Sequence, residues 1–465
     1  MFVLGGGEPG ERPGAVAEGG YVMVTLTVGN EESASAMGRG VVAVRELSLR
    51  IIGAVLQIAA TLVVVQILPP NMAGIYFKGF IIAYGLAALL RGKYELFIAQ
   101  HFVNPQPSEL NARARAVVRA MGIRVWIRSA LACAGLLVVT ADLDVMDVYL
   151  HPYLQTYLPF ILAVPFATLA LFLATTLRAT NRTLGSVIVS TYSINAMIVI
   201  AAMVVSFRAE DELVILSWAF FFGCLLASLM GVLLTRYVFR VPRDSVHLKL
   251  SPAEWREIYT STGENGLTGL ALAGLQWGPL CALAVLGADI EIAEYAVVTR
   301  TTALVDFLIP AVIFVPQSAR FQSRLCRAMR TARGKLAVDL SVSLATTTVA
   351  VLLVGVLTPV FVGWYGPDYS GLTLLFVLLF ITQWVNGASR PAIRRLAADW
   401  DLQRIRWVLS TSMAAAILLS VFGIERYGAV AAAVGVLGGA VLLNSQALEA
   451  AFRRAASAPL SPTGS

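Results

Sequence analysis

The sequence predicts an all-α polytopic membrane protein with about twelve transmembrane helices in two six-helix bundles. Leu, Ala, Val and Ile recur in blocks of about 20 residues, the length that crosses roughly 30 Å of hydrocarbon. The 465 residues are 58% hydrophobic and only 14% charged, whereas about a quarter of the residues in a soluble domain are charged. A soluble helical protein with a large core is therefore disfavoured.

The apolar blocks place twelve spans along the chain. The first bundle, residues 41–240, has spans at 46–67, 74–92, 121–140, 155–177, 184–206 and 213–238. The second bundle, residues 259–450, has spans at 262–286, 293–318, 337–363, 371–389, 406–424 and 427–447.

Three further segments complete the predicted domain organisation. The basic segment 241–258 is expected to form a cytoplasmic linker between the bundles. Residues 1–40 are rich in Gly and Glu and lack a signal-peptide pattern, so we expect a disordered cytoplasmic tail, with Met37 as an alternative start. Residues 451–465 form the second cytoplasmic tail.

The two bundles show a weak internal repeat. The turn and span in residues 65–95 have an echo 219 positions later, in residues 284–310, where Tyr295 matches Tyr76. With the same offset, Gln276 matches Gln57 in the preceding span. Two halves of like orientation would be related by an axis along the membrane normal, with substrate bound between them.

The basic residues predict the orientation in the membrane. Lys78, Arg208, Arg300 and Arg426 lie at or near the short connections, and the other 31 of the 35 Lys and Arg lie on the opposite side or in the tails. The positive-inside rule then places both termini in the cytoplasm. This distribution also explains the net charge of +7 without nucleic acid. The outer connections are too short to fold into a domain, which argues against a sugar polymerase or ligase.

Polar side chains, which are costly to place inside a membrane, are concentrated in the first two spans. In the first span, Arg50 and Gln57 belong to a polar stripe on one helical face, and Arg45 lies near the inner interface, where it could equally snorkel to water. In the second span, Lys78 lies near the outer end and Arg91 near the inner surface. A structural ion pair of Arg91 with Glu95, four residues later, is an open alternative to ligand binding.

The seventh and eighth spans repeat this concentration. The seventh has Asn265 and Gln276, flanked by Glu264. Arg300 and Asp306 in the eighth are the deepest full charges, about 11 and 20 Å inside a span that starts near residue 293. They lie about 120° apart around a helix, so each needs a partner from another helix, from water or from a substrate.

The sequence offers no cofactor or metal motif. The four cysteines have no metal-ligand spacing, and there is no Walker A sequence or HExxH motif. We therefore expect no cofactor, no metal site and no enzymatic activity.

The chain resembles the polysaccharide-transporter branch of the multidrug/oligosaccharidyl-lipid/polysaccharide exporter superfamily. The resemblance lies in the twelve spans and in three segments, ILPPNMAGIYFKGF, VLGADIEIAEYAVVTRTTALVDFL and LRATNRTLG. This branch contains O-antigen and exopolysaccharide flippases. The resemblance implies a central cavity lined by spans 1, 2, 7 and 8. It also implies alternating-access export of an oligosaccharide linked to polyprenyl pyrophosphate across the bacterial inner membrane, for surface polysaccharide biosynthesis.

A pyrophosphate head group would need cationic ligands, and guanidinium groups bind phosphate in a bidentate fork. Arg300 is the first candidate, followed by Arg50, Arg91, Arg45 and Lys78, with Gln57, Gln276 and Asn265 as polar lining residues. Asp306 and Glu264 are candidates for a cation or proton site.

Partners and alternatives follow from the same resemblance. The expected partners are the lipid-linked oligosaccharide and membrane lipid, with a polysaccharide polymerase and co-polymerase left open, and the chain is expected to be a monomer. A cation-coupled multidrug exporter is the alternative within the superfamily, and a membrane-embedded sugar polymerase or ligase is the alternative outside it.

Overall fold

The computed structural model describes residues 36–101, 108–142, 154–180, 182–205, 211–239, 251–253, 255–256, 258, 260, 266–314, 332–398 and 402–457. Within these ranges, some side chains near helix ends lie outside the described part, among them those of residues 36–47 and 50. The predicted linker 241–258 and the tail up to residue 35 fall largely or wholly outside it, so the predicted domain bounds remain predictions.

Six helices or helix runs account for the first six predicted spans. The fifth is interrupted by a π-helical turn, η2, inside a run of α6 and α7. In order they are α1 (Ala36–Ile67), α2 (Pro70–His101), α3 (Ser108–Asp142), α5 (Leu154–Ala179), α6 (Thr183–Val187) with η2 (Ile188–Tyr192) and α7 (Ser193–Val205), and α8 (Glu212–Val238).

The second six spans follow the same plan with two differences. The eighth is broken into two helices, and the last two are continuous through a kink. The elements are α10 (Gly266–Leu286), α11 (Asp289–Thr302), α12 (Leu304–Phe314), α14 (Ala332–Tyr365), the short 3₁₀ turn η4 (Pro367–Tyr369), α15 (Thr373–Ala398) and α16 (Leu402–Ser457).

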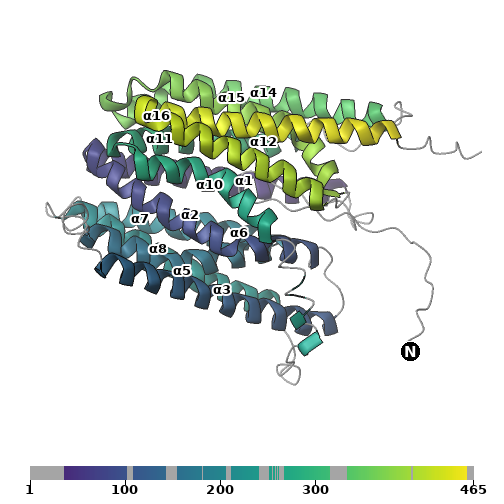
Figure 1. Cartoon of the computed structure of the whole chain (residues 1–465), viewed down its shortest axis with the longest axis horizontal. Coiled ribbons are helices and arrows are strands. Elements are labelled where there is room, and N and C mark those ends of the chain that lie inside the picture. Colours follow the sequence, from purple (N-terminus) through teal and green to yellow (C-terminus); the bar gives the residue numbers. More distant parts are fainter. Residues whose placement is uncertain are drawn as a thin grey trace, which may run out of the picture.

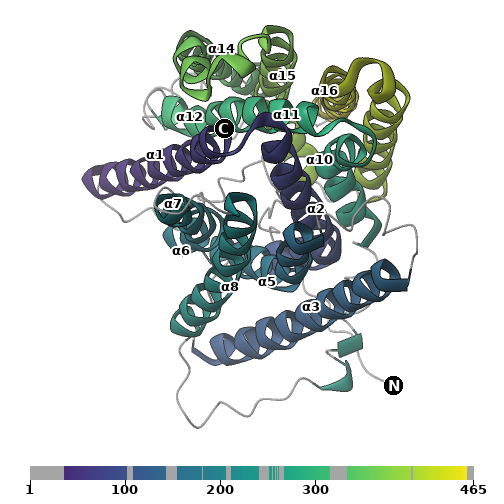
Figure 2. The ribbon, with the colours of Figure 1, turned by 90° about the vertical axis from the view of Figure 1, so that its left-hand side faces the viewer.

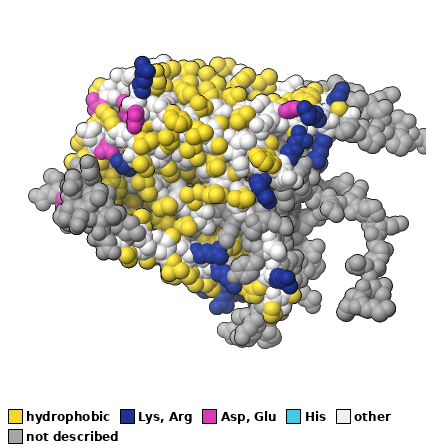
Figure 3. Space-filling view, viewed as in Figure 1, with side chains coloured by type: hydrophobic (Ala, Val, Ile, Leu, Met, Phe, Trp, Pro, Cys, Tyr) yellow, Lys and Arg dark blue, Asp and Glu magenta, His cyan; other side chains and the backbone are white. Residues whose placement is uncertain are grey.

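The all-α membrane architecture is confirmed. Among the described residues, eight helices are long and apolar enough to cross a membrane, and one of these covers Gln403–Ala456, the last two predicted spans. Large apolar side chains lie on the exterior, such as Phe422 at 82% and Val356 at 77% exposure. Figure 3 shows this apolar surface with most acidic side chains at one end and most basic ones at the other.

The helices form two groups with α1 and α2 between them. In Figure 2, α10 to α16 lie above and α3 to α8 below. Along the chain, α5 packs against α2, α3 and α8, while α16 packs against α10 and α15. The groups meet where α2 packs against α10 and α11, and where α1 lies against α11 and α12. Figure 1 shows these helices side by side along the long axis.

The predicted repeat appears in the helix boundaries. α1 ends at Ile67 and α10 at Leu286, while α2 begins at Pro70 and α11 at Asp289. Both pairs are 219 positions apart, 286 less 67 and 289 less 70. The matched tyrosines, Tyr76 of α2 and Tyr295 of α11, are both 1% exposed. The two helix–turn–helix units therefore share their register as well as their hydropathy.

Three local features depart from simple spans. In η2, the Ser193 hydroxyl donates to the Ile188 carbonyl five residues earlier, which fits the wider π turn. In α16, Gly428 has φ of +51°, and a Cβ there would overlap the Glu291 carboxylate. Glycine therefore allows the two last spans to fold back with no loop between them. The third feature, the break between α11 and α12, shapes the candidate site.

Candidate functional site

Arg300 lies where the two halves meet. It belongs to α11 of the second half, yet its Nη1 donates to the Thr61 hydroxyl of α1 at 3.2 Å. Its guanidinium carbon lies 4.4 Å from the ring centroid of Phe80 and 5.5 Å from that of Phe77, both on α2. The Thr61 hydroxyl in turn donates to the carbonyl of Gln57. Arg300 thus finds the partner from another helix that the sequence required.

The depth of Arg300 suits a site inside the membrane. It lies eleven residues after the start of α11 at Asp289, or about 16 Å along the helix at 1.5 Å per residue. That is close to half of a hydrocarbon core of roughly 30 Å. A permanent positive charge is therefore held half-buried near mid-membrane and between the halves.

The break between α11 and α12 assigns the two deep charges to different helices. Around Ala303, the hydroxyls of Thr301 and Thr302 donate to backbone carbonyls of their own helix, and the Asp306 N–H turns back to the Ala303 carbonyl. Such side-chain bonds compete with regular helix bonding. Arg300 then stands in the last turn of α11 and Asp306 in the first turn of α12. Both charges have the sign that stabilises the helix end they occupy.

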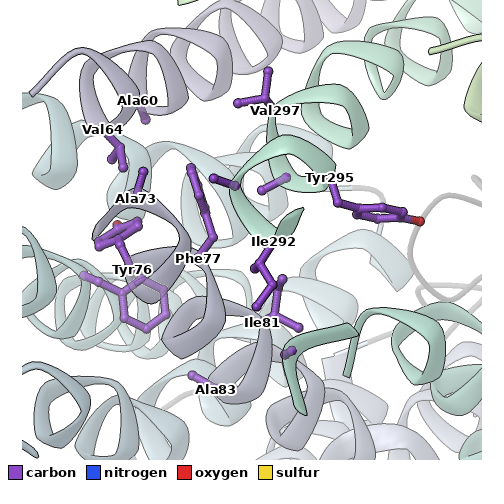
Figure 4. Packing of buried hydrophobic residues seen from close by; sticks show 14 of the residues in the cluster. Ala60, Val64, Ala73, Tyr76, Phe77, Ile81, Ala83, Ile292, Tyr295 and Val297 are labelled. Carbon is purple, nitrogen blue, oxygen red and sulfur yellow. The ribbon is translucent and has the colours of Figure 1, made fainter. Parts of the chain in front are cut away.

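Aromatic rings connect Arg300 to the α2–α10 contact. Phe80 stacks on Tyr84 at 4.6 Å between centroids, and Tyr84 stacks on Trp277 of α10 at 5.8 Å. Buried apolar residues of α1, α2 and α11 surround this region, and Figure 4 shows Ile81 and Ile292 pointing toward one another across the α2–α11 contact. The cation thus lies at one end of a row of aromatic faces that crosses between the halves.

Lys78, predicted as a head-group ligand, forms a contact at the starts of α2 and α11. Its Nζ lies 3.3 Å from Asp289 Oδ1, with both side chains partly exposed. Near it, a Cβ on Gly74 would overlap the Asp289 carbonyl, so glycine permits the close approach of the two helices. At the same end, Gln66 donates to the Trp364 carbonyl at 3.0 Å. Figure 2 shows this end, where α1 turns into α2 beside α11.

The other predicted cations lie apart from Arg300 or outside the described part. Arg91 is 9% exposed and its Nη1 donates to the Leu171 carbonyl of α5 at 3.3 Å, inside the first half. The Glu95 side chain lies outside the described part. Arg45 and Arg50 lie on α1, but their side chains also fall outside it.

The predicted polar lining residues are described only in part. Gln57 on α1 and Gln276 on α10 are both half-buried. Asn265 and Glu264 lie outside the described residues. Within the described part, no group of three or more His, Cys, Asp or Glu side chains is placed to hold a metal ion.

Asp306 is paired with an arginine that the sequence reasoning missed. Arg390 Nη2 donates to Asp306 Oδ1, and the two side chains are 5% and 6% exposed. The Gln383 side chain lies near the same carboxyl. We expected residue 390 in a basic inner loop after a span ending at 389. Instead, α15 continues through Pro391 to Ala398.

A polar network continues beside this ion pair. The Ser389 hydroxyl bonds to Asn444 Oδ1, and Asn444 Nδ2 donates to Asn386 Oδ1 at 2.9 Å. Spacing could have revealed it, because Gln383, Asn386 and Arg390 follow one another by three and four residues on one helical face. The proline after Arg390 hid this continuation, since proline commonly ends a helix.

Comparisons with known proteins define the fold. No protein-family model matches the sequence, and no curated protein does. Among solved structures, the lipid II flippase MurJ in an inward closed conformation matches with a TM-score of 0.60 and 11% identity, over 88% of this chain and 87% of that one. An inward-facing multidrug resistance MATE family transporter of the MOP superfamily matches with a TM-score of 0.56 and 12% identity, over 91% of this chain and 100% of that one. An outward-facing transporter of the same description matches with a TM-score of 0.53 and 13% identity, over 90% of this chain and 96% of that one.

These likenesses establish that the chain has the fold of MOP superfamily transporters. The resemblance inferred from the sequence is confirmed as a likeness of fold. At 11–13% identity the likeness concerns the fold alone.

Proposed function

We propose that this chain, which has the MOP transporter fold, is a flippase that moves an oligosaccharide linked to polyprenyl pyrophosphate across the bacterial cytoplasmic membrane. The observation that carries the proposal is Arg300, a permanent cation about 16 Å along α11 that contacts α1 and α2 of the opposite half. A site between halves is where alternating access exposes a substrate to each side in turn.

The sign of the charge between the halves favours an anionic substrate. The deep carboxyl of Asp306 is already neutralised by Arg390 inside the second half, so it adds no net negative charge at the α2–α11 contact. A pyrophosphate must give up its hydration inside a low-dielectric site, and a guanidinium supplies charge-assisted bonds that compensate this loss. Arg300 would bind the head group when the halves separate from their present contact.

The remaining predicted residues take secondary roles in this proposal. Lys78, now bonded to Asp289, would meet the head group toward the outer side. Arg91, Arg45 and Arg50 would meet it toward the inner side, with Gln57, Gln276 and Asn265 as polar lining. The glycan would cross between the halves together with the head group, and a polymerase or co-polymerase would receive it on the outer face.

The test is a translocation assay with purified protein in liposomes that carry a fluorescent polyprenyl-pyrophosphate-linked sugar. Exposure of the sugar to an impermeant quencher reports movement between leaflets. Arg300→Gln should reduce the rate at least tenfold, because a hydrogen bond to a charged group contributes roughly 1.5–3 kcal/mol. Arg300→Lys should retain part of the rate, since the charge stays while the fork is lost.

Arg333→Gln is the matched control, because Arg333 is exposed near the start of α14 and away from the α2–α11 contact. Thermal unfolding of each variant confirms that the fold is intact. Translocation that is equally fast in wild type and in a folded Arg300→Gln variant would refute the proposed role of this residue. No translocation by the wild type above protein-free liposomes would refute the flippase itself.

A cation-coupled exporter of cationic drugs is the second candidate, favoured by the aromatic row. Phe80, Tyr84 and Trp277 present ring faces of the kind that attract organic cations. On this hypothesis a carboxyl must become available, and Asp306 or Glu264 would supply it. Dye efflux that is lost in an Asp306→Asn variant shown to be folded by thermal unfolding, and retained in Arg300→Gln, would favour this function over the first.

A further inference from the structure

The contact between α2 and α10 contains three aromatic rings whose faces are nearly parallel. Phe80 and Tyr84 of α2 stack with 4.6 Å between their ring centroids and 26° between their planes. The Tyr84 ring stacks on Trp277 of α10 at 5.8 Å and 22°. Because α2 belongs to the first half and α10 to the second, the Tyr84–Trp277 stack joins the two halves (Figure 2). One face of each of these two rings would therefore open if α2 and α10 moved apart.

Each of the two rings is held by its own half. Phe220 of α8 is fully buried, and its ring centroid lies 5.9 Å from that of Tyr84. Next to Trp277, a Cβ added to Gly278 would overlap the Ile417 side chain of α16, so α10 lies tightly against α16 at this level. Tyr84 would thus move with α2 and α8, and Trp277 with α10 and α16.

Both rings lie in the middle part of the membrane. Tyr84 is fourteen residues after the start of α2 at Pro70, or about 21 Å along the helix. Trp277 is nine residues before the end of α10 at Leu286, or about 14 Å. Tyr and Trp are enriched at the two membrane–water interfaces. Their position between the halves and away from both interfaces therefore needs another explanation.

The stack begins beside the proposed head-group site. The Arg300 guanidinium carbon lies 4.4 Å from the ring centroid of Phe80. Tyr84 follows four residues later on α2, about 6 Å nearer the cytoplasmic end in the predicted orientation. This separation is comparable to the distance from a phosphate to the centre of a sugar ring bonded to it. A pyrophosphate bound at Arg300 would therefore place its first sugar at the level of Tyr84 and Trp277.

The chemistry of the two faces fits a sugar ring. Tyr and Trp are among the side chains with the largest apolar area, so separating them in water is unfavourable unless a ligand covers the opened faces. A pyranose presents C–H groups on the faces of its ring and hydroxyls around the edge. A sugar between the two rings restores the apolar contact and leaves its hydroxyls toward water. An organic cation would also attract ring faces, but the Arg300 charge beside Phe80 repels it at this end of the stack.

We propose that Tyr84 and Trp277 form an aromatic clamp, in which the sugar attached to the pyrophosphate stacks between the two rings when the halves separate. This clamp, which rests on the proposed flippase function, assigns a place to the glycan as Arg300 does to the head group. It makes the protein select a sugar-bearing lipid over the bare polyprenyl pyrophosphate, because only the former fills the space between the rings.

The test measures lipid binding to the purified full chain in detergent. Polyprenyl pyrophosphate is titrated alone and with one glucose, galactose or N-acetylglucosamine attached, and the bound lipids are counted by native mass spectrometry. We expect at least one sugar-bearing lipid to bind about fivefold more tightly than the bare lipid, the order of magnitude of an aromatic contact. Arg300→Gln should weaken the binding of both kinds of lipid and leave the preference between them.

Trp277→Leu and Tyr84→Leu each remove one face of the clamp and should abolish most of the preference for the sugar. Trp277→Phe keeps a smaller face and should retain part of it, which keeps the test open if one leucine variant proves unstable. Trp407→Leu is the matched control, because Trp407 is 66% exposed on the outside of α16. Thermal unfolding identifies the variants that are folded.

The outcomes separate the clamp from the proposed function. A wild-type protein that binds none of these lipids would contradict the flippase itself. Equal binding of bare and sugar-bearing lipids by the wild type, or an unchanged preference in folded Trp277→Leu, would overturn the clamp alone. Tetraphenylphosphonium that binds to the wild type and not to Trp277→Leu, without any preference for sugar, would also overturn it and would assign the rings to cationic drugs.

Discussion

Asp306 and Arg390 show how two full charges are accommodated inside the second half. Their side chains are almost completely buried, and they connect α12 to α15. Bringing both ions out of water is costly, and their mutual attraction and further hydrogen bonds repay this cost only while both partners are present. Among the described residues, Asp306 Oδ2 has no hydrogen-bond partner, so the carboxylate depends on Arg390. The pair is therefore sensitive to the loss of either member alone.

We expect Asp306→Asn and Arg390→Gln each to lower stability by about 3 kcal/mol, because each leaves one uncompensated charge in the protein interior. The double variant should recover much of this loss, since it removes both charges. Thermal unfolding of the four proteins in one detergent gives the coupling energy directly. Losses that simply add in the double variant would contradict the ion pair.

At the scale of residues, the sequence identified Arg300 as one of the two deepest charges. It predicted only part of the set of residues that surround this side chain. The depth of Arg300 follows from counting along a helix. Its partner Thr61 lies 239 positions away, and a pairing at that distance depends on how the halves pack. Arg390 was missed for a local reason, the proline that follows it. Whether Arg300 contacts a substrate stays a prediction.

At the scale of helices, the halves approach one another closely where α2 meets the start of α11. Gly74 has no side chain, so the Asp289 backbone can lie against it, and Lys78 reaches Asp289 one turn further along. A short salt bridge between partly exposed side chains contributes little by itself. The steric fit at Gly74 is therefore the stronger determinant of this contact.

Gly74→Ala should open or distort the contact, although alanine is intrinsically the better helix former by about 1 kcal/mol. Overpacking typically costs about 1–3 kcal/mol, so we expect a net loss of stability and faster modification of a cysteine placed at Lys78. Gly355→Ala on α14 is the matched control, because a Cβ there meets nothing within 4 Å. Lower stability of Gly355→Ala than of Gly74→Ala would contradict this account.

The sequence predicted where helices lie more successfully than how they are interrupted. Hydropathy and length place all twelve spans, because a membrane requires continuous apolar segments with satisfied backbone bonds. The π turn after Ile188, the break at Ala303 and the fold-back at Gly428 depend on individual hydroxyl–carbonyl bonds and on close neighbours such as Glu291. Such features follow from packing, which periodicity does not report.

At the scale of the whole molecule, the distribution of charge predicts the orientation. Most basic side chains lie at one end and most acidic ones at the other (Figure 3). The turn η4 lies at the connection between α14 and α15, which the positive-inside rule assigns to the outside. The end of α16 belongs to the opposite side.

In a chain whose four native cysteines are replaced, Ser370→Cys should react with an impermeant maleimide added to intact cells. Both Ser370 and Ala456 are exposed, so Ala456→Cys provides the comparison and should react only after permeabilisation. The extent of labelling on gels is the measurement. The reverse pattern would contradict the predicted orientation.

Composition predicted the membrane architecture because it reflects the membrane as a solvent. The internal repeat predicted two halves because they share one plan. The substrate is less accessible to such reasoning, since transporters of one fold can differ in a few side chains. Here those side chains include Arg300, whose contacts span both halves, and Asp306, whose charge is compensated inside one half.

The break at Ala303 also has a mechanical consequence. On one side of it, α11 contacts α1 and α2 of the first half as well as α15, while on the other side α12 lies against α1 and is bound to α15 by the Asp306–Arg390 pair. If the halves move apart, a continuous helix would have to bend or leave one set of contacts. The interruption would supply a hinge at this point, so that the segment bearing Arg300 could tilt while the ion pair holds α12 to α15.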